Sequence, residues 1–175
     1  MKRSEELKQE LIQLEAQERE FAKGIKEKFG NHWFYGGAAE RAYWNGGGKE
    51  FADRKRQLEF EIAKELNREI EVGDGVTYRL WSDAYACTVI KKTKKTLLIQ
   101  RDKATLDPNF KPEWVAGGFA AHCTNNSDQE YTYERNENGA IYRCNWSEKN
   151  GRYQSGCDGS IRITRGRHEF YDYNF

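Results

Sequence analysis

The spacing of apolar residues predicts two helices in the first 71 positions. Apolar side chains recur at intervals of 4, 3, 7 and 4 residues between Ser4 and Gly30, which is typical of a helix with one buried face. Ser4 is suited to cap the first turn, and Gly30 to end the helix. A similar run follows the three glycines at 46–48. The two apolar stripes consist of Leu7, Leu11, Leu14, Phe21 and Ile25, and of Phe51, Leu58, Ile62 and Leu66.

Each stripe is narrow, and the rest of each helix is strongly charged. Glu18 and Lys55 stand in the one apolar slot that each stripe lacks. Such helices are stable only when the stripe is buried against a partner. We therefore expect an antiparallel helical hairpin over residues 1–71 that serves oligomerisation. The alternative is a hairpin that packs on the sheet of its own chain.

The segment that joins the two helices, residues 30–48, contains five aromatic residues and six glycines. It is too long and too aromatic for a simple helix connection. Packing on the core is the favoured interpretation, because large aromatic side chains are seldom left in water. A contact surface is the alternative.

From residue 72 onward the alternation of polar and apolar residues has a period of two, which is typical of β-strands. Strands are predicted at 76–81, 84–92, 96–102, 130–136, 140–148 and 160–165. Short turns separate most of them, so neighbouring strands must be antiparallel. Residues 103–129, which hold both prolines, are expected to form a long excursion. The chain is thus predicted to be an α+β protein with an antiparallel, SH3-like β-sheet or barrel over residues 72–175, an architecture that implies no function.

Composition adds limits on the class of protein. With 33% charged residues and a mean hydropathy of −1.00, the chain is predicted to be soluble. No apolar run is long enough to span a bilayer, and the first residues lack the apolar stretch of a signal peptide, so the cytoplasm is the expected location. Four cysteines form no CxxC pair and are expected to be reduced thiols: Cys87, Cys123, Cys144 and Cys157.

The charge is nearly balanced in both parts of the chain. Residues 1–71 contain 14 basic and 15 acidic residues, and residues 72–175 contain 15 basic and 13 acidic ones. Bulk charge therefore does not favour a nucleic-acid partner. The four lysines within Lys91–Lys95 could contact a phosphate backbone, but lysines at a hairpin tip more often solvate the turn and discourage edge pairing.

Catalytic motifs are not found in the sequence. There is no GxSxG, HExxH or phosphate-binding glycine loop, and the three histidines are scattered. The pair His122-Cys123 is a weak candidate for a nucleophile or a metal site, because no second close pair of ligands accompanies it. We therefore expect neither an enzyme nor a bound metal or cofactor.

Strand alternation predicts which side chains face outward. In 140–148, Tyr142, Cys144 and Trp146 share the core face, so Arg143 and Asn145 point outward. Arg162 points away from the isoleucines of 160–165 in the same way. If 130–136 lies beside these strands, one face displays the following residues: Tyr131, Tyr133, Arg135, Arg143, Asn145 and Arg162. Guanidinium groups among phenols can bind phosphate and stack on a base. The pattern alone favours a solvated face with cross-strand Tyr–Arg pairs.

A resemblance narrows the functional hypothesis. The segments "VGDGVTYRLWSDAYACTVI", "LLIQRDKA", "YTYERNENGAIYRCNWSEKNGRY" and "GRHEFYDYNF", all between residues 72 and 175, resemble a family of small phage-encoded proteins, the Thoeris anti-defence sponges of the first type described. The resemblance implies binding of cyclic ADP-ribose isomers, and in some members of cyclic trinucleotides. It also implies sequestration without cleavage, in dimers or hexamers that hold the ligand between subunits.

On this basis we expect a phage sponge in the host cytoplasm, with a small cyclic nucleotide ligand and no membrane partner. Arg101, Arg143 and Arg162 are expected to contact phosphates, Tyr133 to stack, and Asn145 to read a base or ribose edge. Arg165 is expected to lie in the same ligand region. The alternatives are an anti-CRISPR-like inhibitor of a protein or nucleic acid, which would use residues 33–44 and Lys91–Lys95, and a structural phage protein.

The chain end "HEFYDYNF" raises a separate question, because chain ends are seldom so aromatic. Alternation places apolar residues on both faces, with Phe170 on one and Tyr171, Tyr173 and Phe175 on the other. We therefore expect a strand that is partly buried on both sides and that seals the barrel or an interface between chains. Arg167 is expected to reach the region of Arg162.

Overall fold

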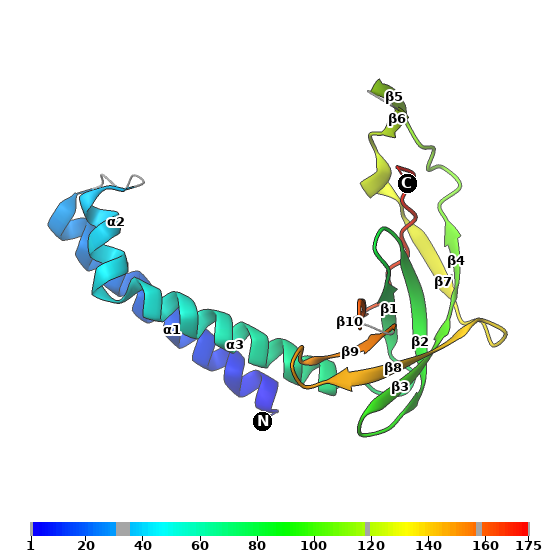
Figure 1. Cartoon of the computed structure of the whole chain (residues 1–175), viewed down its shortest axis with the longest axis horizontal. Helices are drawn as coiled ribbons and strands as arrows, with labels where there is room; N and C mark the ends of the chain where they lie inside the picture. The colour runs from blue at the N-terminus through cyan, green and yellow to red at the C-terminus, as the bar shows by residue number, and fades with distance from the viewer. Residues whose placement is uncertain (1, 31–35, 118–119, 157–158, 175) are drawn as a thin grey trace. The chain divides into compact units, whose positions relative to one another are not determined.

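The computed structural model describes residues 2–30, 36–117, 120–156 and 159–174 of the chain. It forms two compact units, Met1–Leu66 and Asn67–Phe175. The first is helical and the second is built on an antiparallel sheet (Figure 1). The predicted α+β class, with an N-terminal helical hairpin followed by an SH3-like barrel, is confirmed.

The helical unit contains α1 (Arg3–Phe29), α2 (Ala38–Tyr43), a π-helical turn (Trp44–Gly48) and most of α3 (Lys49–Arg68). α1 and α3 run antiparallel and lie side by side (Figure 1). Their apolar stripes meet as predicted, with Leu7, Leu58 and Ile62 buried. α1 begins earlier than predicted, because the Glu5 carboxylate accepts the Lys2 backbone N–H at 3.3 Å, and Ser4 is therefore buried inside the first turn.

The two polar interruptions of the stripes pair with each other. The Lys55 ammonium lies 3.6 Å from the Glu18 carboxylate and 3.3 Å from that of Glu15. Glu18 also accepts a hydrogen bond from the Tyr43 hydroxyl at 2.5 Å. The two charged residues that interrupt the apolar stripes thus form an ion pair across the hairpin. This pair favours one alignment of the turns of α1 with those of α3.

The described part of the segment between the helices packs against α1. Tyr43 is buried and its ring lies 5.6 Å from that of Phe21. A Cβ on Gly48 would approach the Tyr43 ring to 2.3 Å, so this contact requires glycine. Trp44 is half exposed. Residues 31–35, including the predicted contact residue Trp33, lie outside the described residues.

Six strands of the second unit close into a barrel in the order β1-β10-β9-β8-β3-β2, and each pairs antiparallel with its neighbours. They are β1 (Gly75–Arg79), β2 (Ala84–Lys92), β3 (Thr96–Arg101), β8 (Ile141–Ser147), β9 (Arg152–Ser155) and β10 (Ile161–Arg165). Alternate side chains fill the interior, among them Val76, Val89, Leu97, Ile99 and Ile163. The predicted core positions Cys144 and Tyr142 belong to this cluster, and Cys144 is fully buried.

The excursion carries strands of its own, which the sequence pattern did not show. β4 (Lys103–Leu106) pairs with β7 (Tyr131–Glu134), and β5 (Trp114–Gly117) pairs with β6 (Ala120–Cys123). A 3₁₀ turn spans Asn126–Asp128. The condition that 130–136 lies beside 140–148 is therefore not met, because β7 pairs with β4, and β3 and β9 occupy both sides of β8.

The chain end forms no regular strand, although it is partly buried on both faces as predicted, through Phe170 on one face and Tyr173 on the other. Phe170 makes an isolated bridge with Ala84, through main-chain hydrogen bonds of 3.0 and 2.9 Å. Tyr171 is exposed, whereas Glu169 is buried. Tyr173 packs against Phe110 and the edge of Trp114. Polar bonds rather than apolar burial thus hold most of this segment. Phe175 lies outside the described residues.

Candidate functional site

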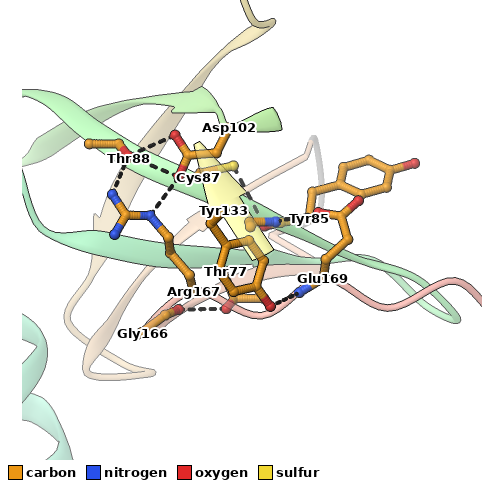
Figure 2. Close-up of polar contacts among 10 residues, drawn as sticks. Thr77, Tyr85, Cys87, Thr88, Asp102, Tyr133, Gly166, Arg167 and Glu169 are labelled. Atoms are coloured by element: carbon orange, nitrogen blue, oxygen red, sulfur yellow. Dashed lines mark hydrogen bonds and ion pairs between the residues drawn. The ribbon is translucent and has the colours of Figure 1, made fainter. Parts of the chain in front are cut away.

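Two residues predicted to bind ligand, Arg101 and Tyr133, belong to a polar network in the barrel unit. Figure 2 shows Tyr133 beside Glu169 in this network. The Arg101 guanidinium lies 3.7 Å from the centre of the Tyr85 ring and donates to the Glu169 carboxylate at 2.9 Å. The Tyr133 hydroxyl accepts the Glu169 backbone N–H at 3.2 Å. Both side chains already have partners within the chain, so this geometry favours a structural role for them.

The same network fixes the chain before its end (Figure 2). Buried Asp102 accepts hydrogen bonds from the Thr88 hydroxyl and from Nε of Arg167, each at 2.7 Å. Arg167 also donates to the Thr88 hydroxyl at 2.9 Å. A buried carboxylate requires a charged or hydrogen-bonded partner, and Arg167 provides it for Asp102. The expectation that Arg167 extends toward Arg162 is therefore not met.

The remaining predicted residues lie on the outside of the barrel. Arg143, Asn145 and Arg162 are exposed, as alternation predicted. Asn145 stands opposite Gln154 of β9, and Gln154 stands opposite Arg162 of β10, so one strand separates the two predicted residues. Arg165 is also exposed, and its guanidinium lies 3.9 Å from the Asp74 carboxylate.

A different group of arginines surrounds Arg162. Arg79 of β1 stands directly opposite Arg162 in the β1–β10 pair, and Arg152 of β9 lies on the same outer face. Together they line an open cleft of 260 Å³, which we call the arginine cleft. Its lining consists of Arg79, Leu80, Trp81, Arg152, Ser160 and Arg162. None of these lining residues carries a carboxylate.

The charges of the arginine cleft are not neutralised within the described part of the chain. No ion pair involves its three arginines there, and the hydrogen bond of Arg79 goes to the neutral Thr164 hydroxyl at 3.2 Å. The Nε atom of Arg152 is buried and has no hydrogen-bond partner among the described residues. Like charges in directly opposed positions of a sheet are destabilising. The cleft is therefore a place where an anion would relieve repulsion and accept several guanidinium hydrogen bonds.

Trp81 adds an apolar surface to these charges. It lies in the turn after β1, where the Leu80 N–H donates to the Asp83 carbonyl at 2.9 Å, and its side chain is 95% exposed. An uncovered indole next to guanidinium groups is suited to stack on a nucleobase. Trp81 and Arg79 were missed as site residues because the sequence assigns both to an ordinary strand. Alternation does place Arg79 outward, but its pairing with Arg162 joins strands far apart in the chain.

The described residues give little support for a metal site or for a reactive cysteine thiol. Within the described ranges, no group of three or more His, Cys, Asp or Glu side chains could hold a metal ion. Cys123 is buried and its neighbour His122 is exposed, so this pair does not converge. Burial raises the pKa of the Cys87 and Cys144 thiols to about 12, which keeps both protonated at neutral pH.

Comparison of the chain with protein-family models, curated proteins and solved structures gave no match. Among the helices that the structure describes, none combines the length and the apolar character needed to cross a membrane.

Proposed function

We propose that the barrel unit binds a cyclic nucleotide-type immune second messenger at the arginine cleft and retains it without cleaving it. The observation that carries this proposal is the set of three unneutralised guanidinium groups beside the exposed indole of Trp81. A cyclic ADP-ribose isomer combines a pyrophosphate with adenine, which are the two groups that arginines and an indole recognise. The resemblance to the phage sponges supports this choice of ligand. Cyclic trinucleotides carry phosphodiester groups in place of the pyrophosphate and also present nucleobases, so arginines and an indole could recognise them in the same way.

The size of the cleft supports a shared site. At 260 Å³ the arginine cleft is smaller than the 300–1,000 Å³, roughly, of pockets that enclose small ligands. A ligand of this class would thus stay partly uncovered on a single chain. We infer that a second copy completes its enclosure, in a dimer or hexamer, as the resemblance implies.

Calorimetry with cyclic ADP-ribose isomers and cyclic trinucleotides tests the proposal. Arg79→Gln and Arg162→Gln are each expected to weaken binding about 10- to 100-fold, because a hydrogen bond to a charged group contributes about 1.5–3 kcal/mol. Trp81→Ala is expected to weaken it by about 1–3 kcal/mol through lost stacking. The matched control is Lys103→Gln, which removes an exposed charge from β4.

Two results would contradict the proposal. One is the lack of binding of every ligand by folded wild-type protein. The other is recovery of a chemically altered ligand after incubation, which would indicate an enzyme. If the ligands bind but all three cleft variants behave as the wild type does, the site lies elsewhere on the molecule.

A further inference from the structure

A second cleft in the barrel unit lies between the end of α3, the β2–β3 hairpin and β8. Its volume is 530 Å³, and its lining includes one acidic residue, Glu148. We call it the lysine cleft, and its other lining residues are Arg68, Lys92, Lys94, Lys95, Trp146 and Tyr153. It shares no lining residue with the arginine cleft. The two are therefore separate features of the surface.

The lysines are presented by a fixed turn. The Thr93 hydroxyl oxygen accepts the Thr96 backbone N–H at 3.0 Å, and the Thr93 N–H donates to the Thr96 carbonyl at 2.8 Å. The Trp146 backbone N–H donates to the Lys95 carbonyl at 2.8 Å, which ties the turn to β8. Lys94 and Lys95 thus start from a defined backbone position at the cleft, which lowers the ordering cost of binding.

The charges of the cleft do not balance. The Arg68 guanidinium pairs with Glu148 at 3.1 Å, and the Lys92 ammonium pairs with Glu71 at 2.8 Å. Lys94 and Lys95 have no ion-pair partner in the described part of the chain. Two positive charges therefore remain beside the cleft after the internal pairs are counted.

Trp146 forms an aromatic wall of the cleft. Its ring lies 5.2 Å from the Arg68 guanidinium and packs edge-on against Tyr153 at 5.0 Å between ring centres. Its indole Nε1 is buried and has no acceptor among the described residues. Buried donors without an acceptor are rare in native proteins and call for an explanation, such as an additional bound group. The indole is thus both a part of the cleft and a natural reporter of its occupancy.

We propose that the lysine cleft binds a small molecule through a phosphomonoester or pyrophosphate group. Lys94 and Lys95 would neutralise a dianion, a role for which lysine is suited as a compact point charge. A carboxylate ligand carries one charge and matches the pair less well. The volume of 530 Å³ lies within the range of small-molecule sites, so the phosphate would be joined to an organic group that packs against Trp146.

The test uses the full chain with three probes: inorganic pyrophosphate, AMP and ribose 5-phosphate. Calorimetry at low ionic strength is expected to show saturable binding of at least one probe with a Kd below about 1 mM. In ¹⁵N NMR spectra, the Trp146 indole N–H signal is expected to shift as the probe is added. The double variant Lys94→Gln/Lys95→Gln should weaken binding about tenfold or more, because it removes the two unpaired charges.

Two controls separate this site from its surroundings. Lys91→Gln changes an exposed lysine of the same hairpin that does not line the lysine cleft, so the affinity for the probe should stay within about twofold of the wild-type value. Lys103→Gln should likewise leave probe binding intact, because Lys103 lines neither the lysine cleft nor the arginine cleft. The Trp146 signal and the effect of the double variant report on the lysine cleft itself, so failure of the function proposed for the arginine cleft would leave these two results unchanged.

The inference is overturned if folded wild-type protein binds none of the three probes, or if the double variant binds as tightly as the wild type. It is also overturned if the cleft binds only single-stranded nucleic acid, with a steep dependence on salt concentration and no affinity for the small probes. That last outcome would assign the lysines to a nucleic-acid backbone.

Discussion

Asp102 and Glu169 are buried carboxylates whose charges are met by arginines at the edge of the barrel. Arg167 lies 2.7 Å from Asp102, and Arg101 lies 2.9 Å from Glu169, whereas the arginine side chains themselves remain about a third exposed (36% and 38%). Such a pair adds little compared with an apolar core, but loss of one partner leaves an uncompensated charge inside the protein. These contacts are therefore sensitive points for stability.

Replacing Arg167 by glutamine is expected to lower the free energy of unfolding by about 2–4 kcal/mol. This lies toward the lower end of the cost of breaking a buried pair, because part of the Arg167 side chain is in water. Urea denaturation followed by tryptophan fluorescence measures the change. Arg135→Gln, at an exposed position, serves as the control and should change stability by less than about 0.5 kcal/mol. An Arg167→Gln midpoint equal to that of the wild type would contradict this assignment.

At the scale of elements, the chain end acts as a clasp although it forms no regular strand. Phe170 bonds to Ala84 at the start of β2, and the Tyr171 carbonyl accepts the Gln129 side-chain amide at 2.7 Å. The Asp172 N–H donates to the Asp83 carboxylate at 3.0 Å. Residues 170–172 thus connect the β1–β2 turn to the segment before β7.

Deleting residues 170–175 is expected to unfold the barrel unit or to lower its melting temperature strongly, because the bridge to Ala84 and the bonds to Gln129 are lost together. Circular dichroism and thermal melting measure this effect. Tyr171→Ser is the matched control, since it removes an exposed side chain and keeps the main-chain bonds. A deletion variant with wild-type melting behaviour would show that the segment is dispensable.

Much of this architecture could be predicted, because helix stripes and strand alternation are local signals. The spacing of Leu7 to Ile25 predicts α1, and the alternation around Cys144 predicts which side of β8 is buried. The site could be predicted only in part. The position of Arg79 opposite Arg162 depends on the register of two strands that lie about 80 residues apart in the chain. The hydrogen bond from the Glu169 N–H to the Tyr133 hydroxyl depends on a segment without regular secondary structure.

At the scale of the whole molecule, both clefts belong to the barrel unit, and in our proposal the helical unit supplies further contacts between copies. In a single chain, four large apolar side chains among the described residues of the helical unit remain exposed: Ile12, Phe29, Trp44 and Phe60. Their exposure supports the expectation of a homo-oligomer, although single exposed apolar residues are common on protein surfaces.

Sedimentation velocity of the full chain is expected to show a homo-oligomer. Ile12→Ser/Phe60→Ser should shift the population toward monomer, because it reduces exposed apolar area and leaves the buried stripes intact. Arg135→Gln, an exposed position outside the arginine cleft, is the control and should leave the oligomeric state unchanged. A wild-type protein that stays monomeric at all concentrations would contradict assembly and the shared ligand site together.

The clasp at the chain end also sets the order of events during synthesis. The barrel needs β10 to close, Asp102 lacks its arginine partner until Arg167 has been added, and the Ala86 N–H lacks its acceptor until Glu169 has been added. The helical unit, which comes first, has all of its own contacts within residues 1–66. The helical hairpin can therefore fold before the barrel sequence has been translated, whereas closure of the barrel requires β10 and the residues just after it.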